Sequence, residues 1–168
     1  YCTRHDGSIR KSSTERRGSI MNKALKELLG KEMDDLKNAC DSLEYSYDRC
    51  CSLTIRAGLD YETMERFEAL TARFARLSDI MIQKVFRTLD TLDLEDRGTV
   101  RDRINRAEKR GVIESTDDFV EIRMVRNEIA HEYKSETILE IFERVLTLTP
   151  SLMKAVEGIE TYSTKYLE

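Results

Sequence analysis

Apolar side chains recur along most of this chain at intervals of three and four residues, the period of an amphipathic α-helix. The two longest stripes predict helices over residues 33–53 and 61–89. The first stripe is Met33, Leu36, Cys40, Leu43, Tyr47, Cys50 and Leu53, and the second is Met64, Phe67, Leu70, Phe74, Leu77, Met81 and Val85. A shorter helix is expected over residues 22–29, ended by Gly30, and Gly58 is expected to follow the first long helix.

The segment from residue 90 to 98 is acidic and has no helical period, so it is expected to be a loop. Thr99 can cap a short helix that runs through Arg110 and ends at Gly111. The next helix is expected to begin at Ser115 or Thr116, with Asp117 and Asp118 in its first turn, and to extend to about Tyr133.

Two further helices are expected after the segment that ends at Tyr133. Ser135 can cap one that runs to about Leu148. Pro150 suits the first turn of another, which would continue to the C-terminus. The pattern therefore predicts an all-α fold, an up-and-down helical bundle of about four to five main helices.

The composition agrees with this fold class and suggests where the domain begins. The 168 residues include one Pro, seven Gly and no Trp, which favours helices over strands. Residues 1–20 are rich in Arg, Lys, Ser and Thr, and we expect a disordered tail or added sequence there. A basic arm for nucleic acid is the alternative interpretation. Residues 21–168 would form the helical domain.

Charge and cysteine content narrow the classes of function. The net charge is −4, whereas general nucleic-acid coating proteins are basic, so any RNA or DNA contact must be local. The cysteines show no C-x-x-C spacing, and Cys40 and Cys50 fit an apolar helical pattern, which suggests a reducing compartment. No apolar run is long enough to cross a bilayer, so we expect no membrane association and a cytoplasmic location.

The helix predicted over residues 116–133 carries the residues best suited to chemistry. Its apolar arc consists of Phe119, Ile122, Val125, Ile129, Ala130 and Tyr133, and Arg126 lies within that arc. Asn127 and His131 stack on one flank at i and i+4, and Arg123 extends that flank by a turn. Glu121, Glu128 and Glu132 fall on the opposite side, which we expect to face water.

An imidazole and a guanidinium on one helix suit acid–base chemistry at a phosphodiester. Histidine titrates near neutral pH, and an arginine fork binds phosphate oxygens and stabilises developing charge. The pair suits RNA cleavage by its own 2′-hydroxyl, with no metal or cofactor. Each residue also has a structural interpretation: His131 can interact with a helix C-terminus, Arg126 can pair with a Glu at the core edge, and Tyr133 can be a core aromatic.

A metal site is the other chemistry that this helix suggests. Glu128-x-x-His131 is a fragment of the di-iron carboxylate pattern, which needs the motif twice and two further Glu. The only other histidine is His5, in the expected tail, so we expect no metal site. No phosphate-binding glycine loop or Ser–His–Asp arrangement is present either.

The string from Arg126 to Tyr133, RNEIAHEY, resembles the R-x4-H-x-Y signature of the HEPN superfamily. More narrowly, it is similar to HepT-type toxins and to the substrate-binding subunits that accompany nucleotidyltransferases. The preceding segments 97–102 (RGTVRD) and 110–113 (RGVI) are also similar to that family, and the likeness covers residues 22–166, weakly outside the motif.

The resemblance implies a HEPN-like bundle that forms a homodimer, with the paired motifs in a shared cleft. Arg126 and His131 would be catalytic in a metal-independent ribonuclease, and Asn127 and Arg123 would support them. Tyr133 would be the position at which a minimal nucleotidyltransferase antitoxin attaches AMP. The alternatives are a non-catalytic subunit that presents a substrate or nucleotide to that partner, and a plain helical scaffold.

Overall fold

The computed structural model of the chain describes residues 8–131 and 137–168, with side chains from residue 18 onward. All regular secondary structure in these residues is helical, which confirms the all-α bundle. The elements are α1 (Ser8–Cys50), α2 (Tyr61–Asp79), the π-helix η1 (Ile80–Val85), α3 (Phe86–Leu92), α4 (Val100–Lys109), α5 (Thr116–Ala130) and α6 (Ile138–Leu167). Because α2, η1 and α3 follow one another without a break, they form one continuous rod.

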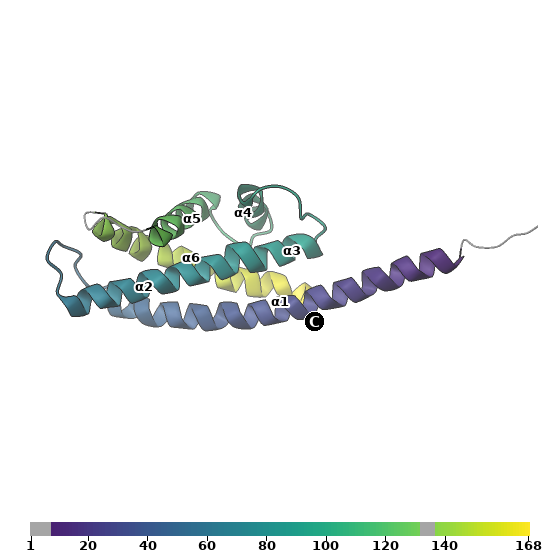
Figure 1. Cartoon of the computed structure of the whole chain (residues 1–168), viewed down its shortest axis with the longest axis horizontal. Coiled ribbons are helices and arrows are strands. Elements are labelled where there is room, and N and C mark those ends of the chain that lie inside the picture. Colours follow the sequence, from purple (N-terminus) through teal and green to yellow (C-terminus); the bar gives the residue numbers. More distant parts are fainter. Residues whose placement is uncertain (1–7, 132–136) are drawn as a thin grey trace, which may run out of the picture.

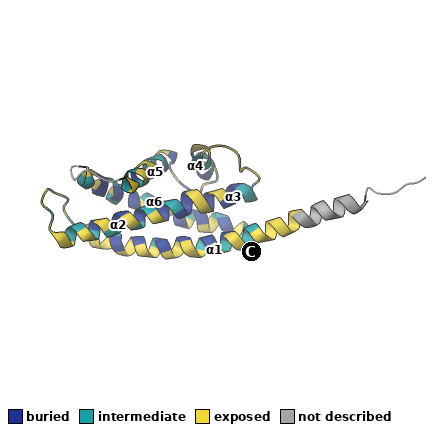
Figure 2. Cartoon of the chain, in the orientation of Figure 1, coloured by how far each residue is buried: buried dark blue, intermediate teal, exposed yellow. Residues whose placement is uncertain are grey.

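The long helices lie side by side, and the short ones cover one face of them. Figure 1 shows α1 and the α2–η1–α3 rod running in opposite directions, with α6 alongside them and α4 and α5 on the far side of the rod from α1. The first turns of α1 project beyond the other helices, and the described side chains there, from residue 18 on, are exposed (Figures 1 and 2). The motif helix α5 packs on both α2 and α6.

The core is built from the predicted apolar stripes. On α1, residues spaced seven apart, Leu29, Leu36, Leu43 and Cys50, are completely buried. This spacing keeps one face of a long helix against its neighbours. Phe67 of α2 stacks on Phe142 of α6, with ring centroids 4.8 Å apart. Burial of such side chains supplies the main stabilising free energy of the bundle.

The predicted caps of α4 and α5 are confirmed. The Thr99 hydroxyl accepts from the Asp102 amide, and the Asp102 carboxylate accepts from the Thr99 amide, which makes a reciprocal capping box. Gly111 follows α4 with φ of +70°, the left-handed conformation that favours glycine. Ser115 caps α5 by accepting from the Asp118 amide.

Two predicted helix boundaries are wrong because packing overrides local signals. Gly30 does not end a helix, since buried Leu29 and Glu32 hold both sides of it against the bundle. Pro150 lies inside α6 and does not start a helix. Its exposed ring points away from the core. The preceding Thr149 donates its hydroxyl to the Val145 carbonyl at 2.6 Å, next to the position where proline lacks a backbone N–H to donate.

The start of the first helix also differs from the expected one. Helix α1 begins at Ser8 and passes through the segment expected as a tail, so the predicted start at residue 22 is too late. Residues 1–7 lie outside the described part of the chain. Among the described helices, none combines the length and apolar character needed to span a bilayer.

Candidate functional site

Helix α5 buries the first half of its predicted apolar face and exposes part of the second. Phe119, Ile122 and Val125 are buried, and Ile129 is half-buried, whereas Ala130 is exposed. Arg126 lies at the edge of this apolar face, where its side chain is 33% exposed. The functional side chains therefore lie along the border between the core and solvent.

The helix ends earlier than expected, and this ending defines the position of His131. Helix α5 stops at Ala130, and His131 has extended backbone with φ −95° and ψ 144°. Its amide bonds to the Glu128 carbonyl at 3.1 Å, and its side chain is exposed. Tyr133 lies outside the described residues, as does the expected cap Ser135, so the proposed modification of Tyr133 stays a prediction.

Arg126 is held by a carboxylate of another helix, that of Asp79. Its Nε lies 2.7 Å from Asp79 Oδ1, and its Nη2 lies 2.8 Å from Oδ2, which is a bidentate ion pair. Its Nη1 approaches Asn127 Oδ1 at 3.5 Å. Hydrogen bonding to Asp79 raises the pKa of Arg126, so the guanidinium stays fully charged.

Asp79 is the last residue of α2, directly before the π-helix. In η1 the hydrogen bonds reach one residue further than in an α-helix, and the Phe86 amide donates to the Met81 carbonyl. Such single π-turns occur frequently at functional sites. The sequence shows only a lone acidic residue beside an apolar run and gives no sign that it approaches α5; in the structure Ser78, Ile80 and Ile82 are buried and Asp79 is not.

A cavity of about 330 Å³ opens beside this ion pair. Its lining comes from the α2–η1 junction and from α5: Ser78, Asp79, Ile82, Gln83, Lys84, Arg123, Arg126 and Asn127. The lining thus contains three cations and one carboxylate. Within the described residues neither Lys84 nor Arg123 forms an ion pair, so the cavity has an excess of positive charge.

The cavity gathers three of the four predicted site residues that the structure describes, and it leaves out His131. Arg126, Asn127 and Arg123 line it together, as expected from their places on α5. His131 stands at the end of the same helix, outside the lining. The contribution of Lys84 and Asp79 was missed because their closeness to α5 depends on how α2 and η1 pack.

The acidic flank of α5 faces water only in part, since the side chains of Glu121 and Glu128 are 40% and 42% exposed, and Glu132 lies outside the described residues. Arg144 of α6 lies between Glu121 and Glu128, with its Nη1 2.6 Å from Glu128 Oε2 and its Nη2 2.5 Å from Glu121 Oε1. Glu128 is therefore engaged in helix packing. In the described part of the chain no three His, Cys, Asp or Glu side chains gather as metal ligands would.

A second charged cluster joins α3, α4 and the end of α6. Asp90 receives Arg106 Nη2 and Arg110 Nη1, each at 2.5 Å. Asp93 lies beside it, and although burial alone would raise its pKa, hydrogen bonds from Tyr166, Tyr162 and Lys165 hold the pKa below the ordinary value. Because these charges satisfy one another, the cluster acts as a structural clamp.

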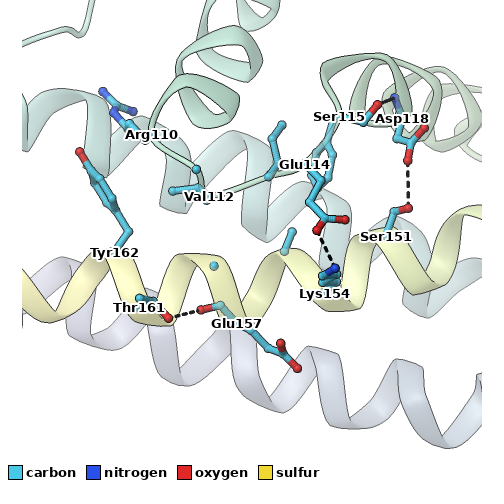
Figure 3. Close-up of a pocket in the computed structure, with 15 residues that line it drawn as sticks. Arg110, Val112, Glu114, Ser115, Asp118, Ser151, Lys154, Glu157, Thr161 and Tyr162 are labelled. Atoms are coloured by element: carbon cyan, nitrogen blue, oxygen red, sulfur yellow. Dashed lines mark hydrogen bonds and ion pairs between the residues drawn. The ribbon is translucent and has the colours of Figure 1, made fainter.

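Another cavity, of about 340 Å³, lies between the α4–α5 connection and α6 (Figure 3). Its one lysine is already paired, since Lys154 reaches Glu114 at 2.6 Å, and Asp118 accepts a hydrogen bond from Ser151 at 3.0 Å. Arg110 at its edge belongs to the charged clamp. Among the described residues, both cations of this lining, Arg110 and Lys154, are thus ion-paired, unlike Lys84 and Arg123 beside Arg126.

Comparisons with known proteins return no match: no family model, no curated protein and no solved structure is similar to this chain.

Proposed function

We propose that this protein is a HEPN-like ribonuclease that binds an RNA phosphodiester at the cationic cavity and cleaves it without a metal ion. The observation that carries the proposal is the excess of positive charge in that cavity. Lys84, Arg123 and Arg126 line one small opening in a chain with a net charge of −4. Local cations of this kind are what an acidic protein needs to bind a nucleic acid.

The residues have complementary roles in the proposed reaction. His131 takes the proton of the 2′-hydroxyl, and the resulting oxygen attacks the adjacent phosphorus to form a 2′,3′-cyclic phosphate. The bond to the 5′-oxygen breaks, and this oxygen leaves as a hydroxyl with a proton supplied by water. Arg126 stabilises the negative charge that builds on the phosphate oxygens, and Asn127 supports the guanidinium. The exposed imidazole of His131 is free to reach a substrate.

We propose that a second copy of the chain completes the site, since His131 lies outside the cavity lining of its own protomer. A two-fold pairing of α5 helices would bring each histidine to the partner's cavity. Met124, on the same solvent-facing side of α5 as Asn127, is 51% exposed and would lie within such an interface.

A minimal nucleotidyltransferase is the proposed antitoxin, and AMP on Tyr133 would silence the enzyme. The added group would place a phosphate and a nucleoside two residues from His131. Both would compete with RNA for the same opening.

The Arg126–Asp79 pair favours one alternative, a non-catalytic subunit that presents a substrate or nucleotide to the nucleotidyltransferase. In that role the guanidinium would organise α2 against α5, and His131 would serve no chemistry. The alternative predicts binding of nucleotides or RNA without any cleavage.

The decisive experiment is RNA cleavage by the purified protein in excess EDTA. We expect cleavage by the wild type and a loss of about 100-fold or more for His131→Ala and Arg126→Ala. Arg56→Ala, at an exposed loop position far from α5 in the sequence, is the control and should cleave normally. Equal cleavage by wild type and His131→Ala would contradict the proposal, and binding without cleavage would favour the alternative subunit.

A further inference from the structure

The ion pair at Arg126 uses the atoms that a phosphate would need. Asp79 presents two oxygens to Nε and Nη2 at 2.7 and 2.8 Å, in the bidentate geometry that arginine also adopts with phosphate. A carboxylate of this chain and a phosphate oxygen pair of a ligand therefore resemble each other in charge and in shape. Both cannot occupy the same edge of the guanidinium.

The surroundings make this pair easy to open. The Asp79 side chain is 41% exposed and that of Arg126 is 33% exposed, so water screens their attraction. The neighbours Ser78 and Ile80 are buried and fix the backbone at the α2–η1 junction. Opening the pair thus needs only side-chain rotation, with no movement of a helix.

The cavity contains further cations that a phosphate ligand can use and Asp79 does not. Lys84 and Arg123 line the same opening, and neither is ion-paired within the described residues. An incoming phosphodiester therefore gains contacts with all three cations. Removing the single negative charge of the lining would increase that attraction.

We propose that Asp79 occupies the phosphate position on Arg126 in the free protein, and that a phosphodiester binds by displacing it. This inference rests on the proposed function of the cavity. Asp79 thereby weakens the binding of anions and sets the affinity of the site. A role limited to holding Arg126 in position would have the opposite effect, because loss of Asp79 would then weaken binding.

The test is the affinity for a fluorescent single-stranded 2′-deoxy oligonucleotide, which lacks the nucleophile and cannot be cleaved. We expect Asp79→Asn to bind about fivefold more tightly than the wild type, because the competing charge is gone and the shape is kept. The slope of log affinity against log salt concentration should become steeper by up to about 0.7, because Asp79 no longer neutralises Arg126 and this cation then pairs fully with a phosphate. A merely structural role would not move this slope.

Glu114→Gln is the matched control. It removes the same charge from another exposed ion pair, with Lys154, outside the cavity, and it should bind as the wild type does. Asp79→Asn combined with Arg126→Ala should lose the gain. Equal or weaker binding by Asp79→Asn, or an equal gain in Glu114→Gln, would overturn the inference.

The outcome is distinguishable from failure of the proposed function. RNA cleavage that depends on His131, together with no gain in Asp79→Asn, would retain the ribonuclease and reject the displacement. A gain in Asp79→Asn with no RNA cleavage by any variant would retain the displacement and reject the ribonuclease. Thermal unfolding of each variant checks that the fold is intact.

Discussion

Asp90 is a carboxylate that is almost completely withdrawn from water, with its side chain 2% exposed. Three guanidinium groups surround it, those of Arg106 and Arg110 at 2.5 Å and that of Arg103 at 3.8 Å. Buried charges of this kind are tolerated because each compensates the desolvation of the others. The removal of one member therefore leaves the rest uncompensated.

We expect Asp90→Ala to lower the free energy of unfolding by about 3–5 kcal/mol, because three arginines lose their shared acceptor. Urea unfolding followed by circular dichroism measures this. Asp117→Ala is the control, since that exposed carboxylate is 3.9 Å from Arg101. Its effect should stay within about 0.5 kcal/mol. Similar stabilities for the two variants would contradict the structural clamp.

Glu32 is a buried carboxyl whose charge disfavours folding. Burial raises its pKa from the ordinary value of 4.5, against the smaller opposing effects of a hydrogen bond from Thr88 and the charge of Lys84. Because the folded pKa lies above the unfolded one, folding becomes less favourable as the pH rises from about 4.5 through the folded pKa.

We therefore expect Glu32→Gln to increase the free energy of unfolding by about 1 kcal/mol at pH 7 and to have little effect at pH 4. Chemical denaturation across this pH range tests the prediction. Exposed Glu27 on the same helix provides the control, and the free energy of unfolding of Glu27→Gln should differ from that of the wild type by the same amount at every pH. A destabilised Glu32→Gln at pH 7 would show that the charged form is favoured.

Individual residues of the candidate site were predictable only where they share one helix. The spacing on α5 predicted that Arg123 and Asn127 share a flank and that Arg126 emerges from the neighbouring apolar arc, and all three line the cavity. Asp79 and Lys84 were not predictable, because they come from a helix more than 35 residues away in the chain. Their approach to Arg126 depends on the packing of α2 and on the π-turn.

At the scale of elements, glycine and proline signals are reliable only where packing does not oppose them. Gly111 ends α4 as predicted, with positive φ. Gly30 and Pro150 lie within continuous helices, since apolar residues on both sides of each are buried in the bundle. Local chemistry thus predicted the caps correctly, whereas the helix lengths depended on tertiary contacts.

Two helical glycines should respond in opposite ways to alanine. Gly30 has open space where a Cβ would lie, so Gly30→Ala should stabilise the protein by about 0.5–1 kcal/mol. At Gly158 the Cβ would meet the Val112 carbonyl oxygen at 2.2 Å, and Gly158→Ala should destabilise it by about 1–3 kcal/mol. Thermal unfolding of the two variants compares them directly. The same sign for both would contradict the close approach of α6 to the α4–α5 connection.

At the scale of the whole molecule, the bundle combines an acidic total charge with a local cationic opening beside Arg126. The charge of −4 disfavours indiscriminate coating of RNA, whereas the cavity beside Arg126 is the place where we propose that a phosphate binds. Within one protomer the two residues of the proposed reaction are separated, since Arg126 lines that opening and His131 lies outside it. A symmetric pair of protomers would resolve this separation.

This arrangement makes a prediction about mixed dimers. If each site takes Arg126 from one protomer and His131 from the other, a dimer of Arg126→Ala with His131→Ala has one complete site. Half of the dimers are mixed after co-refolding at equal amounts, so we expect about a quarter of the wild-type cleavage in EDTA. Each variant refolded alone should remain inactive. An inactive mixture, with mixed dimers verified by differently tagged chains, would show that no site combines the two residues across the interface.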